Sequence, residues 1–111
     1  MAELDPILIG SPDRYYAIDV GTTEKEVAVI TDPIIVIGLT ATNKTVNNVR
    51  VVLYFEPSGG QKQHRWGPRT IPPGEALEIA AGSREVLMPG DRVLARASED
   101  YSLDVWLSYI K

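Results

Sequence analysis

The chain has 111 residues, of which 44% are hydrophobic and 23% are charged, and its formal net charge at pH 7 is -4. This length and composition fit one globular domain and exclude a disordered or fibrous chain. The absence of cysteine excludes disulfides and thiolate metal sites. The acidic balance argues against a nucleic-acid coat, because such binding depends on Lys and Arg that neutralise phosphates.

Membrane and export signals are also missing from the sequence. Residues 1–6 are acidic and short of apolar side chains, unlike a secretory signal. The longest apolar run, residues 34–39, falls far below the roughly 20 residues that a membrane-spanning helix needs. We therefore expect a soluble protein that contacts neither a membrane nor nucleic acid.

The first half of the chain carries four strand patterns. Residues 15–20, 26–31 and 34–42 are rich in Val, Ile, Thr and Tyr, which strands favour. In the fourth pattern, residues 49–55, every odd position is apolar, so these side chains share one face of an extended strand. We expect this face to be core; it comprises Val49, Val51, Leu53 and Phe55.

Three more strand patterns follow at residues 76–79, 91–98 and 103–109. The last of them alternates strictly. Its expected core side consists of Leu103, Val105, Leu107 and Tyr109. The opposite side carries Asp104, Trp106 and Ser108, so a tryptophan is expected on the outside.

Turn formers rather than helix starts separate these patterns. They are Asp32-Pro33, Gly67-Pro68 and residues 42–44, 57–60, 72–74 and 89–91. Residues 74–84 alone have some helical propensity, but Gly82 interrupts them, and we assign them to a strand and a loop. About eight short strands with Pro/Gly turns predict an all-β fold: a single-domain antiparallel β-sandwich, with a jelly roll as the expected connection.

The expected domain covers residues 14–111 and is preceded by an arm or tail, residues 1–13. Pro6 and Pro12 argue against a helix in this arm. We expect the arm, if ordered, to cross to a neighbouring subunit.

Candidates for catalysis are few. His64 is the one histidine, and its neighbours Lys62 and Arg65 disfavour the protonated ring, so we predict a contact residue rather than a base. Glu99 and Asp100 lie at the turn before the last strand pattern and are expected to face water.

An enzyme would require a pair of carboxylates among Glu56, Glu99, Asp100 and Asp104 to converge in a cleft. Calcium binding would require a spaced Asp/Asn loop that ends in Glu, which the sequence lacks. We therefore predict no enzymatic activity, no cofactor and no metal.

Aromatic side chains give the more specific signal. Tyr54 and Trp106 fall on the faces opposite the apolar stripes of their strands, where exposed rings mark contact surfaces unless a second layer covers them. Residues 61–69 add a local basic and aromatic patch to an acidic protein. The candidate protein-contact residues are Lys62, His64, Arg65, Trp66, Arg69, Tyr54 and Trp106.

Four motifs follow one another in the second half of the chain: VVLYFEPSGG at residues 51–60, RTIPPGE at 69–75, MPGDRV at 88–93 and ARAS at 95–98. In this order and spacing they resemble small all-β virion proteins of tailed bacteriophages and prophages. The resemblance covers roughly residues 31–111, and residues 1–30 match only loosely. The prolines and glycines of the motifs map onto turns.

The resemblance implies a structural role in the virion, without chemistry and without catalytic or ligand residues to carry over. The implied function is decoration or cementing of a capsid, through contacts with the major capsid protein or another virion protein. A homo-oligomer, with a trimer favoured, would assemble in the host cytoplasm and reside in the virion.

Two alternatives stay open. The first is a component of the phage neck or tail, where ring symmetry would replace the threefold. The second is a carbohydrate-binding β-sandwich module that uses Trp66, Trp106 or Tyr101 as a stacking platform.

Overall fold

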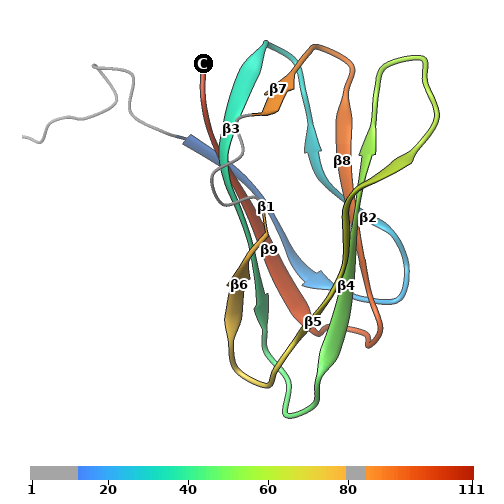
Figure 1. Cartoon of the computed structure of the whole chain (residues 1–111), viewed down its shortest axis with the longest axis vertical. Coiled ribbons are helices and arrows are strands. Elements are labelled where there is room, and N and C mark those ends of the chain that lie inside the picture. The colour runs from blue at the N-terminus through green and yellow to red at the C-terminus, as the bar shows by residue number, and fades with distance from the viewer. Residues whose placement is uncertain (1–12, 80–84) are drawn as a thin grey trace, which may run out of the picture.

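The computed structural model describes residues 13–79 and 85–111, which form two antiparallel sheets (Figure 1). Within these ranges there is no helix that could span a membrane. The strands are β1 (Asp13–Val20), β2 (Lys25–Val29), β3 (Ile34–Asn43), β4 (Val49–Glu56), β5 (Gln63–Ile71), β6 (Ala76–Glu78), β7 (Glu85–Leu87), β8 (Arg92–Ala97) and β9 (Leu103–Ile110).

The strand pairing is nested along the chain. The first strand pairs with the last, β2 pairs with β8, β3 pairs with both β6 and β7, and β4 pairs with β5. Two further pairings, β3 with β9 and β4 with β8, complete a five-stranded sheet of order β1-β9-β3-β6, with β7 also on β3, and a four-stranded sheet of order β2-β8-β4-β5. The predicted all-β, antiparallel two-sheet fold is confirmed.

The core lies between the two sheets and contains the predicted faces. The inward side chains of β4 and β9 are at most 1% exposed; they are Val49, Val51, Leu53, Leu103, Val105 and Leu107. Phe55 is half-buried against this cluster, and Tyr109 is buried. Each fully buried aliphatic side chain stabilises the fold by roughly 1.5–3 kcal/mol.

All seven predicted strands exist, but β5 and β7 were not predicted. Gly67-Pro68, read as a turn, lies inside β5, so that interpretation is wrong. The register between β4 and β5 shifts between Val51 and Leu53, so β5 bulges at this dipeptide. Proline fits here because β5 is an edge strand, where a missing N–H does not break a ladder.

Trp66 belongs to the core and is only 7% exposed, which contradicts its predicted place at the centre of an exposed patch. The reason is its register: Trp66 is paired with Leu53 across the β4–β5 ladder. Directly paired residues point to the same face of a sheet, so Trp66 shares the buried side of Leu53.

The predicted N-terminal arm, residues 1–13, lies outside the described residues apart from Asp13, where β1 begins. Of the segment 74–84, the described part contains β6 and no helix.

Replacing Trp66 with alanine should lower the free energy of unfolding by about 3–5 kcal/mol, the usual range for a buried Trp→Ala change. Trp106→Ala is the matched control and should change stability by about 1 kcal/mol or less, because Trp106 is 46% exposed. Denaturant unfolding measures both values. Equal effects of the two substitutions would contradict the assignment of Trp66 to the core.

Candidate functional site

The outer face of the five-stranded sheet carries a cluster of exposed aromatic and apolar side chains on its two neighbouring strands β1 and β9. Tyr16 is paired with Trp106 across the β1–β9 ladder. With Arg14, Ile18 and Asp104 these two rings line an open depression of about 360 Å³. We call these five residues the aromatic face.

Strand alternation explains why the aromatic face is exposed. Ala17 on β1 and the odd residues of β9 point into the core, so Tyr16 and Trp106 point outward and are 62% and 46% exposed. Trp106 therefore lies where the sequence predicted it. An antiparallel sheet with one free face normally shows polar residues there, and a rimmed apolar patch marks an interaction site.

Arg14 packs against Trp106 in this cluster. Its Cζ atom lies 5.1 Å from the centre of the Trp106 ring, within the range of a cation–π contact. Trp, Tyr and Arg are the residue types most enriched among the energetic hot spots of protein interfaces. The aromatic face brings one of each together.

An ion-pair cluster borders the aromatic face at its Asp104 end. Lys44 Nζ lies 3.0 Å from Asp104 Oδ1 and also binds the carboxylate of Asp19. The Asp19 N–H donates to Asp104 Oδ1 over 3.1 Å. The hydrogen bond to Asp19 raises the pKa of Lys44, and the same bond lowers the pKa of Asp19, so both groups are charged near neutral pH.

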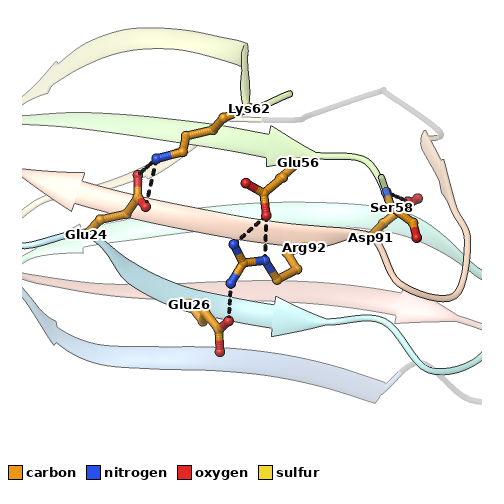
Figure 2. A network of polar contacts seen from close by, with 7 residues as sticks. All are labelled: Glu24, Glu26, Glu56, Ser58, Lys62, Asp91 and Arg92. Carbon is orange, nitrogen blue, oxygen red and sulfur yellow. Dashed lines mark hydrogen bonds and ion pairs between the residues drawn. The ribbon is translucent and has the colours of Figure 1, made fainter. Parts of the chain in front are cut away.

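The predicted basic patch does not form one surface. Figure 2 shows Lys62 reaching across the four-stranded sheet to Glu24, with Nζ 2.7 Å from the carboxylate. Trp66 is in the core, and Arg69 is exposed on β5. The side chains of His64 and Arg65 lie outside the described residues.

Tyr54 points outward, as predicted, but it is only 5% exposed, so its expected role as an exposed ring is wrong. Lys62 Nζ lies 5.2 Å from the centre of the Tyr54 ring, and Arg96 Cζ lies 5.9 Å from it. The charged ends of these two side chains lie over the ring as cation–π contacts and shield it from water.

The four candidate carboxylates lie in three different places. Glu56 binds Arg92 on the outer face of the four-stranded sheet, whereas Asp104 lies on the outer face of the five-stranded sheet. Glu99 and Asp100 lie in the β8–β9 turn. Residues 13–79 and 85–111 contain no cluster of three or more His, Asp or Glu that could hold a metal ion.

Asp100 has a structural task in that turn. Its Oδ1 accepts hydrogen bonds from the N–H of Thr22, at 2.9 Å, and from the Thr22 hydroxyl, at 2.7 Å. These bonds lower the pKa of Asp100, the backbone one having the larger effect. Gly21 permits the close approach, because a Cβ atom there would lie 2.9 Å from the Cα of Asp100.

Sequence reasoning missed the part of the aromatic face that β1 contributes. The signal was present: strand alternation alone places Arg14, Tyr16 and Ile18 on one side of an extended segment. What the sequence could not supply is the pairing of this segment with β9, which lies at the other end of the chain.

Comparisons with known proteins give no functional assignment. No family model and no curated protein matches the chain. A solved structure described as "Crystal structure of PirA" matches 99% of this chain and 97% of that chain, with 12% sequence identity and a TM-score of 0.46.

Replacing Asp100 with asparagine should flatten the fall of the melting temperature in acid. Because folding lowers the pKa of Asp100 from its ordinary value of 3.8, its contribution to stability is present above that pH and is lost as pH falls through the lower, folded value. Thr22→Val keeps the carboxylate and removes one donor, so it should flatten the curve in part. Parallel melting curves from pH 6 to 2 for all three proteins would contradict this role of Asp100.

Proposed function

We propose that this chain is a non-enzymatic virion structural protein that decorates or cements the capsid of a tailed bacteriophage. The observation that carries the docking part of the proposal is the aromatic face, with Arg14, Tyr16 and Trp106 exposed side by side. The viral setting rests on the resemblance of residues 31–111 to small phage virion proteins. The partner would be the major capsid protein or another virion protein.

The nested strand order supports a jelly-roll connection within this proposal. A jelly roll forms when a long hairpin folds over on itself, so that strands from the two ends of the chain pair in order. This rule is followed by the pairs β1–β9, β2–β8 and β4–β5. The remaining strand, β3, pairs with two short strands, β6 and β7, where an eight-stranded jelly roll has a single strand.

Attachment through the aromatic face would act by mass action. A protein that binds only the assembled lattice adds its binding free energy to that state, so each attached copy stabilises the particle. An oligomer that engages several capsid subunits at once would convert modest single contacts into firm attachment.

Replacing Trp106 with alanine should weaken attachment to particles that lack this protein by about thirtyfold or more, the loss expected at a hot spot of about 2 kcal/mol. Co-sedimentation with such particles measures the occupancy. Tyr101→Ala is the matched control, because Tyr101 is 75% exposed but lies in the β8–β9 turn and does not line the depression of the aromatic face. Full occupancy by the Trp106 variant would contradict the proposed docking surface.

The solution mass distinguishes positions within the particle. We expect light scattering after size exclusion to give the mass of three chains, because a symmetric oligomer matches the local symmetry of its lattice site. A larger ring would place the protein in the neck or tail instead. A stable monomer at all concentrations would contradict the expected trimer.

Carbohydrate binding is the second candidate function. Tyr16 and Trp106 form an exposed pair on a sheet face with the Asp104 carboxylate beside them, an arrangement that suits stacking on a sugar ring. Buried Trp66 is unsuited to this role. Glycan titration of a Trp66→Phe variant, in which Trp106 is the remaining tryptophan, separates the two candidates: a saturable change in fluorescence favours the sugar module.

A further inference from the structure

A second depression lies on the outer face of the other sheet, at the end nearest the β8–β9 turn. It has a volume of about 360 Å³ and is lined by Arg50 and Val52 of β4, Pro68 of β5, Arg96 and Ala97 of β8, and Ser98. Val52 is paired with Arg96 across the β4–β8 ladder. Arg50 and Arg96 are both exposed and flank the half-buried Val52. We call this the arginine depression.

The two arginines of β8 differ in their ion-pair partners. Arg92 and Arg96 lie on the same outer face, four residues apart on one strand. Figure 2 shows Arg92 bound by Glu56 of β4 and by Glu26 of β2, with Nε 2.7 Å from Glu56 Oε1 and a terminal nitrogen 2.6 Å from Glu26 Oε2. Arg92 is thus neutralised within the sheet.

The fold supplies no such partner at the other end. The β4 neighbour of Arg96 is Val52, and Glu24, one residue before β2, is already bound by Lys62. Within residues 13–79 and 85–111, no carboxylate lies within ion-pair distance of Arg50 or Arg96. This holds although the chain carries 15 acidic residues against 11 basic ones.

The chemistry of the depression defines what it would bind. A guanidinium presents a planar fork of donors that matches a carboxylate and binds it through two parallel hydrogen bonds. Between the two arginines the surface is apolar, formed by Val52, Ala97 and Pro68. The ligand should therefore combine carboxylates with a small apolar group.

We propose that the arginine depression binds an acidic segment of a partner protein, with carboxylates on Arg50 and Arg96 and an apolar side chain on Val52. An acidic peptide fits better than a long polyanion, because the net charge of -4 repels the remainder of a nucleic acid. The proposal rests on the proposed attachment function and extends it. Docking surfaces on both sheets would let one copy join two neighbouring subunits.

The test uses a short fluorescein-labelled peptide of alternating glutamate and leucine residues, with fluorescence anisotropy at low ionic strength. The wild-type chain should bind it saturably. The double variant Arg50→Ser/Arg96→Ser should bind about a hundredfold more weakly, because each charge-assisted contact contributes at least about tenfold. Lys25→Ser/Lys111→Ser removes the same charge elsewhere and should bind as the wild type does.

Two single variants, Arg50→Lys and Arg96→Lys, keep the charge and remove the fork, so they test the geometry even where the double variant fails to fold. Each should weaken binding severalfold. Absence of saturable binding by the wild type, or equal losses in the lysine control, would overturn the proposal. Tighter binding of oligogalacturonate than of the peptide would also overturn it, in favour of an acidic sugar.

The two proposed surfaces can be tested independently of each other. Trp106→Ala should bind the peptide as the wild type does while it loses attachment to particles. Loss of peptide binding in this variant would contradict the independence of the arginine depression from the aromatic face.

Discussion

The interior position of β9 in the five-stranded sheet, between β1 and β3, is the constraint on which the other features depend. β1 pairs with one edge of β9 and β3 with the other, so the last strand of the chain joins two of the first three. Its inward residues Leu103, Val105 and Leu107 are fully buried and form the middle of the core. Its outward residues, Asp104 and Trp106, become part of the aromatic face. This sheet can form only after the last strand is available to pair with the first. Such long-range pairing gives a high contact order, and folding is therefore slow.

The two outer faces of the sandwich carry different kinds of side chains. The five-stranded sheet exposes rings and aliphatic side chains, and an ion-pair cluster lies at its Asp104 end. The four-stranded sheet instead covers its outward aromatic, Tyr54, with Lys62 and Arg96 and pairs Arg92 with two carboxylates. Surface ion pairs of this kind contribute little to stability, commonly about 0–1 kcal/mol each. Their larger effect is to decide which charges keep an ion-pair partner, and among the described residues of this face Arg50 and Arg96 have none.

Strand positions could be predicted from the sequence where the alternation is strong. The core faces of β4 and β9 are apolar at every second residue, and that period belongs to any extended chain, whatever it pairs with. β5 escaped prediction because its Gly-Pro dipeptide is a turn signal in isolation, and only its place at a sheet edge makes a bulge there acceptable. Because β5 was not predicted, the burial of Trp66 was missed as well, since its inward direction follows from its pairing with Leu53.

The sequence by itself therefore determined the all-β class, most of the strands and the direction of Trp106, because these depend on local spacing and on turn residues. Tertiary structure decided which side chains meet. Tyr16 and Trp106 are far apart in the chain and paired in the sheet, and Arg50 and Arg96, also far apart in the chain, line one depression. Tertiary pairing also left Arg96 beside Val52 and gave Arg92 its carboxylates. Ion pairing and burial depend on distances in space, and in an antiparallel sandwich those distances are set by strand register between segments that local pattern cannot align.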